Sequence, residues 1–319
     1  MSLLDRVRQS CQRVAQQSQQ VHILWDRLPA YAERFAGRSL AAPPPDPAFH
    51  LLGQGSDTLT FFLMLDAINF GSGWFPCLRK VQGQSGYYTI AGALTRWCQQ
   101  HGVPTAAQLQ KLTPADCLRL FDQGPADTDI LGLMLRFCRS LNELGFYISD
   151  RFKGDFTGPV QLAEGDAEAL VTLLADLPGW WDVAMYAGEE VFFLKRAQIA
   201  VADLHLAFDG TGFGAFRNLD RLTLFADNLV PHVLRLDGVL AYEPQLLRRI
   251  ERGELLEAGS PEEIEIRACA VTAVEAMVAA LQQKGHDVSA MALDGLLWHR
   301  GQEPAIKAHP RHRTRTIFY

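Results

Sequence analysis

The sequence has no long hydrophobic run of the kind that crosses a membrane or directs secretion. Its most apolar stretch, residues 59–68, is interrupted by Asp66 and is about half as long as a membrane-spanning helix must be. Residues 1–30 are charged and rich in glutamine, which excludes the apolar core of a secretory signal. We therefore expect a soluble protein of the cytoplasm, without a membrane partner.

An excess of positive charge is also lacking. The chain has 30 Lys and Arg residues against 36 Asp and Glu residues, which gives a net charge of -6. Tight binding to a nucleic-acid backbone depends on cations that displace counterions from its phosphates. The acidic balance therefore argues against a nucleic-acid partner and favours a small ligand or another protein.

Cysteines are scattered rather than paired. The 6 cysteines lie far apart, without a CxxC pair and without a histidine at metal-ligand spacing beside them. We expect reduced thiols, no metal site and no cofactor. The sequence also lacks an internal repeat and a clear linker.

What the sequence does contain is the periodicity of a mainly α-helical protein. Its 319 residues, 48% hydrophobic and 21% charged, suffice for one large domain or for two lobes with a ligand pocket between them. Apolar residues recur at helical spacing over 5–36, 59–70, 90–101, 113–121, 130–146 and 163–177, and again after Lys195. We predict a single, mainly α domain over residues 1–319 with a few short strands.

Two segments break this helical pattern. Residues 190–194 are aromatic and β-branched and follow the turn-forming pair at 187–188, which predicts a strand or hairpin. The proline-rich residues 41–47 predict a rigid loop.

A glycine motif at residues 210–215 (GTGFGA) fits the GxGxxA pattern of a dinucleotide-binding turn. The preceding residues 196–208 are helical rather than strand-like, and no acidic residue follows at the distance of a ribose contact. The motif therefore indicates either a tight hairpin between two helices or a plain glycine loop.

Asp227 lies just before a helix whose first turn contains Pro231, among leucine and phenylalanine side chains. One interpretation is an N-cap, which accepts hydrogen bonds from backbone amides, and spacing alone favours it. The other is catalytic, because a poorly hydrated carboxylate stabilises positive charge that develops nearby. The order of helix, glycine hairpin, helix and Asp resembles the helix-hairpin-helix DNA glycosylases, although the net acidity departs from that family.

Lys195 and Arg196 begin a predicted helix, where two cations oppose the positive end of the helix dipole. They would bind a phosphate there, or they are solvated bases that pair with Glu189 and Glu190.

Asp294, Gly295 and Trp298 share an apolar helical segment near the C-terminus. Gly295 would let a flat ligand approach the backbone, Trp298 would stack on it, and Asp294 would accept two N–H donors from a guanine-like edge. The alternative is a satisfied buried acid beside a core tryptophan. Residues 309–319 are basic but end on an apolar triplet, so we expect them to dock on the body of the protein, with one arginine available to an anionic ligand.

Short sequence blocks in a fixed order make this chain similar to the queuosine salvage family, the queuosine 5'-phosphate N-glycosylase/hydrolases. The blocks are LDAINF (65–70), SGYYTI (85–90), FFLKRAQI (192–199), LTLFAD (222–227), EIEIRAC (263–269), LDGLLW (293–298) and HRTRTIFY (312–319). The resemblance implies a mainly α fold related to helix-hairpin-helix DNA glycosylases. It also implies the hydrolysis of queuosine 5'-monophosphate to queuine and ribose 5-phosphate. We expect the protein to be a monomer.

The resemblance assigns catalysis to Asp227. The base-binding residues that it implies are His50, Phe225, Asp294, Gly295 and His299, of which Gly295 and His299 depart from the aromatic residue and the acid expected there. Queuine is a 7-deazaguanine without N7 to protonate, so Asp227 must stabilise the sugar cation or act as the nucleophile. Two alternatives remain: a base-excision DNA glycosylase, and a non-catalytic queuine-binding protein in which Asp227 is only a cap.

Overall fold

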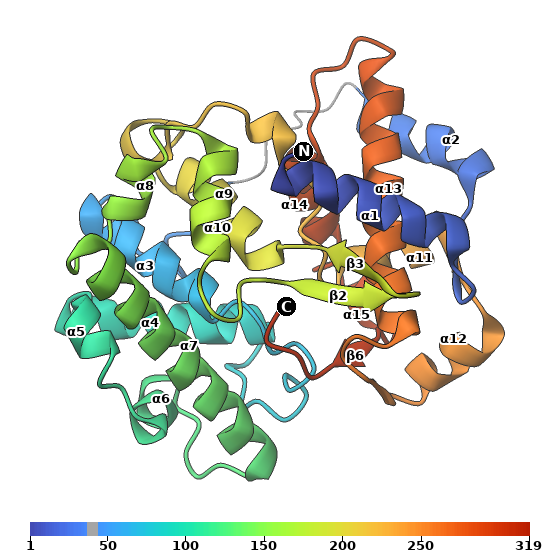
Figure 1. Ribbon diagram of the computed structural model, residues 1–319. Helices are drawn as coiled ribbons and strands as arrows, with labels where there is room; N and C mark the ends of the chain where they lie inside the picture. Colours follow the sequence, from blue (N-terminus) through green and yellow to red (C-terminus); the bar gives the residue numbers. More distant parts are fainter. Residues whose placement is uncertain (37–43) are drawn as a thin grey trace.

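The structure is a computed structural model that describes residues 1–36 and 44–319. Its helices fall into two groups (Figure 1). The middle of the sequence, from α3 to α10, forms one side, whereas the N-terminal helices and those after α10 lie together on the other side. Elements far apart in the sequence therefore meet along the middle of the molecule.

Helices make up most of the described chain, which confirms the mainly α prediction. The first group comprises α3 (Ser56–Ala67), α4 (Gly86–His101), α5 (Ala106–Leu109), α6 (Pro114–Leu120), α7 (Thr128–Phe152), α8 (Gly158–Leu162), α9 (Ala167–Ala175) and α10 (Lys195–Ala207). The second comprises α1 (Leu3–Gln17), α2 (Leu28–Ala32), α11 (Val230–Leu236), α12 (Pro244–Glu251), α13 (Pro261–Gln282), α14 (Ala290–Arg300) and α15 (Pro304–Lys307). The helices predicted from residue 59 to residue 177 are all present.

The strands of the described residues form two-stranded sheets. β2 (Val183–Tyr186) and β3 (Glu189–Phe192) make the predicted hairpin. β1 (Val21–Ile23) pairs antiparallel with β4 (Leu240–Tyr242), and β5 (Leu255–Leu256) pairs parallel with β6 (Arg313–Thr314). These pairs tie the N-terminal and C-terminal segments to the body of the protein.

The predicted helical stretch over residues 5–36 is wrong in its middle, where β1 replaces helix. The Glu265 carboxylate on α13 accepts hydrogen bonds from the backbone N–H groups of Gln19, Gln20 and Val21 at 3.0, 2.6 and 3.1 Å. These amides are therefore unavailable to a helix, and pairing with β4 keeps the chain extended.

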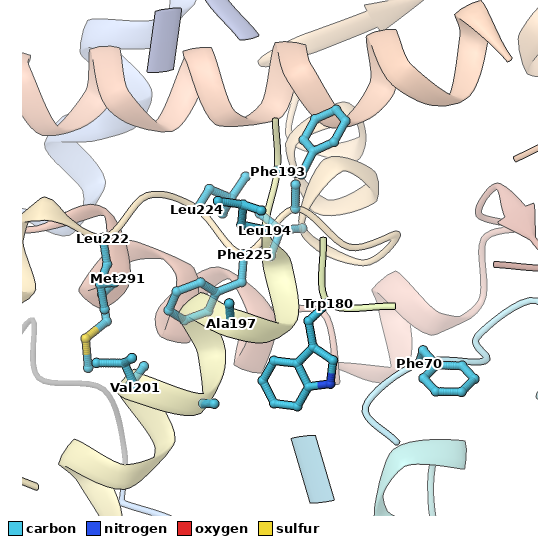
Figure 2. Close-up of a cluster of buried hydrophobic side chains, with 14 of the residues drawn as sticks. Phe70, Trp180, Phe193, Leu194, Ala197, Val201, Leu222, Leu224, Phe225 and Met291 are labelled. Atoms are coloured by element: carbon cyan, nitrogen blue, oxygen red, sulfur yellow. The ribbon is translucent and has the colours of Figure 1, made fainter. Parts of the chain in front are cut away.

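The glycine motif at 210–215 is a loop rather than a hairpin between two helices. It follows α10 and contains the single turn η3 (Gly212–Gly214); a second turn, η4 (Leu219–Arg221), and an extended segment then precede α11. The extended segment is held by a hydrophobic cluster that Figure 2 shows. Leu222, Leu224 and Phe225 pack there with Val201 of α10 and Met291 of α14. The cluster fixes the segment that carries Asp227.

The C-terminal segment docks on the body of the protein, as predicted. Tyr319 is buried, and its carbonyl accepts a hydrogen bond from the N–H of Gly71 at 3.0 Å. Thr314 lies against Gly73, so closely that a β-carbon there would be 2.3 Å from the Thr314 carbonyl oxygen. Of the predicted loop at 41–47, residues 41–43 lie outside the described residues, and residues 44–46 have no regular structure.

Candidate active site

Two cavities meet in the middle of the molecule. The larger has a volume of about 540 Å³ and the smaller about 170 Å³. The residues common to both walls are Asn69, Tyr87, Lys195, Asp227 and Trp298. A ligand that filled both cavities would therefore pass Asp227 and Lys195 at the junction.

The smaller cavity brings together nearly all of the predicted site residues. Those on its wall are His50, Lys195, Phe225, Asp227, Asp294, Gly295, Trp298 and His299. They come from the segment before α3, the start of α10, the extended segment before α11, and α14. Their roles in binding stay predictions, but the structure places them around one space.

The two carboxylate oxygens of Asp227 have different surroundings. Oδ1 accepts hydrogen bonds from the backbone N–H groups of Leu229 at 2.8 Å and Val230 at 3.0 Å. The N-cap residue of α11 is Leu229, so the N-cap interpretation of Asp227 is wrong in position, although its carboxylate does bind the amides that lead into the helix. Oδ2 accepts none from the residues that the structure describes, and the side chain lines both cavities. These two hydrogen bonds hold the carboxylate in place, and its other oxygen remains available to a ligand.

Asp294 is buried on α14 and is hydrogen-bonded to the extended segment that carries Asp227. Its Oδ1 accepts a hydrogen bond from the N–H of Phe225 at 3.1 Å. Burial, and next the negative charge of Asp227, raise the pKa of Asp294 well above its usual range. The carboxyl therefore favours its neutral, protonated form and can donate as well as accept a hydrogen bond.

His50 is a neutral, fixed imidazole in the wall of the smaller cavity. Its Nδ1 lies 2.8 Å from the carbonyl oxygen of Asp46, and its Nε2 lies 3.0 Å from the hydroxyl of Tyr87. Burial lowers the pKa of His50. Nδ1 then donates to Asp46, which leaves Nε2 to accept the hydrogen bond from the Tyr87 hydroxyl.

Lys195 is a buried ammonium at the junction. Its Nζ donates to the backbone oxygen and to Oδ1 of Asn69, both at 2.9 Å, and no carboxylate of the described residues forms a salt bridge with it. Burial lowers the pKa of Lys195, whereas the charges of Asp227 and Asp66 oppose this change. One N–H of the ammonium remains for a ligand.

Arg196 does not reach the site, which corrects its prediction as a substrate-binding residue. Its guanidinium is fully buried and donates to the Ala67 carbonyl at 2.6 Å, to the Ser140 hydroxyl at 3.1 Å and to the Gly179 carbonyl. It lines neither cavity. The pairing of Lys195 and Arg196 with Glu189 and Glu190 is also wrong, because Arg13 and Arg6 bind those acids.

Two acids near Lys195 were not identified as candidate site residues from the sequence. Asp66 of α3 is completely buried, and Asp203 of α10 lines the smaller cavity. The two carboxyls lie close enough for each to affect the pKa of the other, and Asp66 accepts a hydrogen bond from the side-chain amide of Asn69 at 3.1 Å. Burial is the main cause that raises the pKa of Asp66 to about 7 and that of Asp203 well above its usual range.

Charge is segregated between the two cavities. Among the described residues that line the larger one, Asp227 is the sole acid, whereas Lys80, Lys307, Arg311 and Arg313 supply positive charge. In the part of the smaller wall that the structure describes, Lys195 is the sole Lys or Arg, and the acids are Asp46, Asp203, Asp227 and Asp294. The joined space therefore has an acidic end and a basic end.

The described residues, 1–36 and 44–319, contain neither a candidate metal site nor a helix that could span a membrane. They contain no group of three His, Cys, Asp or Glu side chains placed to hold a metal ion. None of their helices is both long enough and apolar enough to cross a membrane.

The fold and the site define a helical protein with a partly open cavity for a small ligand, lined mainly by acids at one end and by cations at the other. Residues 49–319 match the sequence profile of the family described as "Queuosine salvage protein", and the chain belongs to this family. It is 40% identical over 313 residues to the "Queuosine 5'-phosphate N-glycosylase/hydrolase" of Sphaerobacter thermophilus, with 96% of this chain and 95% of that protein covered. The proteins of the same name from Bos taurus and Schizosaccharomyces pombe are 32% and 29% identical, over 85% and 82% of this chain and 85% and 83% of their own lengths.

Proposed function

We propose that this protein hydrolyses the N-glycosidic bond of queuosine 5'-phosphate and releases queuine and ribose 5-phosphate. The observation that carries the proposal is the position of Asp227, at the junction of an acidic cavity and a basic cavity. A nucleotide whose base fills the smaller cavity would present its C1' atom at this junction. The relatives from three organisms carry the name of this activity.

The smaller cavity has the groups that a deazaguanine base requires. Phe225 and Trp298 offer aromatic surfaces, and the neutral His50 and the buried Asp294 offer hydrogen-bonding groups. Queuine also bears a cationic side arm, which suits a cavity with more acids than bases. Guanosine monophosphate lacks this arm and should be a poor substrate.

Bond cleavage follows from the free oxygen of Asp227. As the C1'–N9 bond breaks, its electron pair moves to the base and positive charge develops on the ribose. Oδ2 of Asp227 either stabilises this cation or bonds to C1' and is later displaced. Water then supplies the new C1' oxygen, and the base gains a proton.

We also propose that the protein acts as a monomeric single domain in the cytoplasm, on a free nucleotide rather than on nucleic acid. The net charge of -6 supports this, since duplex DNA would require a cationic surface. Light scattering would test the monomer, and retention on heparin or duplex DNA at low salt would speak for the DNA glycosylase alternative.

Incubation with queuosine 5'-phosphate tests the main proposal. We expect free queuine and ribose 5-phosphate in equal amounts, identified by mass spectrometry. Tight binding of queuine without release of product from the nucleotide would instead identify a non-catalytic queuine-binding protein.

A further inference from the structure

The turn that follows α3 holds the Lys195 ammonium at the junction of the two cavities. Asn69 lies just after Ile68, the C-cap of α3, and its backbone N–H donates to the Asp66 carbonyl at 3.3 Å. Its backbone oxygen and its Oδ1 each accept a hydrogen bond from Lys195 Nζ at 2.9 Å. Two of the three ammonium N–H groups are engaged in this way, so the tetrahedral geometry of the nitrogen sets the direction of the third.

Asp66 fixes the orientation of the Asn69 side chain. Its Oδ1 accepts a hydrogen bond from Asn69 Nδ2 at 3.1 Å. Exchange of the amide oxygen and nitrogen would turn the NH2 group toward the Lys195 ammonium, which has no lone pair to accept a hydrogen bond. Asp66, Asn69 and Lys195 therefore share one hydrogen-bonding arrangement.

The contact with Asn69 does not by itself explain a carboxyl at position 66. The Asp66 side chain is completely buried, and its Oδ2 has no hydrogen-bond partner in the described part of the protein. Burying such a group is costly unless an opposite charge lies nearby. Burial lowers the pKa of Lys195, whereas Asp227 and next Asp66 raise it. In its ionised form, Asp66 therefore favours the charged ammonium at the junction.

The groups that affect the charge of Lys195 come from several elements. These titratable or charged side chains are Asp66 of α3, Arg196 and Asp203 of α10, Asp227 of the extended segment, Asp294 of α14 and, on the wall of both cavities, Tyr87 of α4. Asp66 differs from Asp227 in that it reaches Lys195 through a hydrogen-bonded side chain and does not line either cavity.

The backbone of Lys195 is held as firmly as its ammonium. Leu194, the buried N-cap residue of α10, lies in the left-handed region with a φ of 53°, which leucine rarely adopts. The Asp182 carbonyl accepts hydrogen bonds from the N–H groups of Phe193 at 3.0 Å and Leu194 at 3.4 Å. Oδ2 of Asp182 accepts one from the N–H of Lys195 at 3.4 Å. Both ends of the Lys195 residue are thus fixed.

We infer that Asn69 and Asp66 are positioning residues of the active site: Asn69 directs the free N–H of Lys195 at the ligand, and Asp66 holds Asn69 in the orientation that this requires. The inference rests on the proposed function, in which the nucleotide passes the junction beside Asp227. Neither residue takes part in bond cleavage. Their contribution is an ammonium that is charged and correctly directed before the nucleotide binds.

The pH profile of kcat/KM for queuosine 5'-phosphate tests this arrangement. We expect Asn69→Ala to lower kcat/KM by about ten-fold at neutral pH, because the ammonium loses one acceptor and its direction is less restricted. The alkaline limb of the profile should also move to lower pH, since Lys195 then loses its proton more easily.

Asp66→Asn separates the charge of Asp66 from its hydrogen bond. The variant keeps an oxygen for Asn69 Nδ2 but removes the carboxylate. Because the pKa of Asp66 is about 7, the wild-type carboxylate is ionised in the alkaline range. The variant should therefore move the alkaline limb to lower pH, with a smaller loss of kcat/KM at neutral pH than Asn69→Ala.

Asn142→Ala is the matched control. Asn142 on α7 is partly buried, as Asn69 is, and donates to the carbonyls of Leu109 and Leu112 at 2.6 and 3.2 Å, but it lines neither cavity. This variant should be less stable than the wild type and should keep the wild-type pH profile. Melting temperatures of all the variants distinguish a loss of stability from a loss of position.

NMR of the Lys195 side chain keeps the inference separate from the proposed function. The Nζ and Cε resonances of isotope-labelled lysine, assigned with Lys195→Arg, report the pKa of Lys195 without any substrate. We expect this pKa to fall in Asn69→Ala and in Asp66→Asn and to stay at the wild-type value in Asn142→Ala. For either residue, an unchanged Lys195 titration and an unmoved alkaline limb would overturn its positioning role, even if activity fell. If the wild type released no queuine, the proposed function would fail, and the NMR titration alone would decide the role of Asn69 and Asp66.

Discussion

Asp227 shows how one side chain serves structure and chemistry at once. Asparagine at this position keeps an oxygen that can accept the hydrogen bonds from Leu229 and Val230, so these contacts at the start of α11 should survive. The negative charge at the junction is lost. We expect Asp227→Asn to lower kcat by about a hundred-fold or more while the melting temperature barely changes.

Single-turnover kinetics and a thermal melt would measure both effects. The matched control is Asp220→Asn, which neutralises an exposed acid outside both cavities. A variant of Asp227 with near-normal turnover would show that the residue only binds the amides at the start of α11.

The Asp66–Asp203 pair makes stability depend on pH. Both folded-state pKa values are raised, so the folded protein holds protons that an unfolded chain releases near pH 4. The stabilisation is complete below that pH and is lost as the pH rises through about 7, the value for Asp66. Asp203→Asn should remove the contribution of Asp203 to this dependence, whereas Asp66 keeps its own because burial is the main cause that raises its pKa.

Urea unfolding at pH 5 and pH 8 tests the pair. Relative to Asp203→Asn, the wild type should lose roughly 2 to 4 kcal/mol of unfolding free energy between these pH values, since one pKa unit is worth about 1.4 kcal/mol. Parallel curves for the two proteins would mean that burial does not raise the pKa of Asp203.

At the scale of elements, Arg196 joins α10 to the end of α3 and to the turn before β2. Its guanidinium also stacks against Phe70 and Trp180, with centroid distances of 5.1 and 5.4 Å. Arg196→Ala would leave buried carbonyls without donors, so we expect a loss of about 3 kcal/mol or more in unfolding free energy. Arg248→Ala, an exposed control on α12, should change it by less than about 0.5 kcal/mol.

Urea denaturation measures these losses, and the kinetics of the same variant distinguish a structural role from a role in binding. The ratio of kcat/KM for nucleotide and nucleoside should stay at the wild-type value in Arg196→Ala. A lowered ratio with unchanged stability would show that Arg196 does contribute to binding of the substrate phosphate.

Periodicity in the sequence was sufficient to predict helices such as α1 and α7, because each buries one face through contacts that local spacing encodes. β1 could not be predicted in this way, since its extended form depends on Glu265 and on β4, both more than two hundred residues away. The same limit applies to the prediction of site residues from local spacing. Asp294 and Trp298 share a helix and were found by spacing, whereas Asp66 and Asp203 meet only when α3 packs on α10.

At the scale of the whole molecule, the critical contact is the packing of the docked C-terminal segment against Gly73. Gly73→Ala would place a β-carbon against the Thr314 backbone, which cannot move aside as a flexible side chain can. We expect this variant to displace the segment, to lower the melting temperature and to reduce the preference for the phosphorylated substrate. Gly132→Ala, on α7 with no close backbone neighbour, should instead be neutral or slightly stabilising.

Limited proteolysis with a protease that cleaves after arginine would follow the displacement. Cleavage at Arg313 or Arg315 should be fast in Gly73→Ala and slow in the wild type and in Gly132→Ala. Equal rates in all three proteins would show that the segment tolerates the added methyl group.

The position of Arg311 also bears on how the protein is made. A ribosome builds the walls of the acidic cavity first, and Arg311 and Tyr319 emerge only after α14 and α15 have been translated. The wall of the larger cavity is therefore complete only when the last residue of the sequence has been added. Premature termination near residue 310 would remove the buried Tyr319 and the strand β6 together with Arg311, so we expect a destabilised polypeptide rather than a protein that has lost one contact to its ligand.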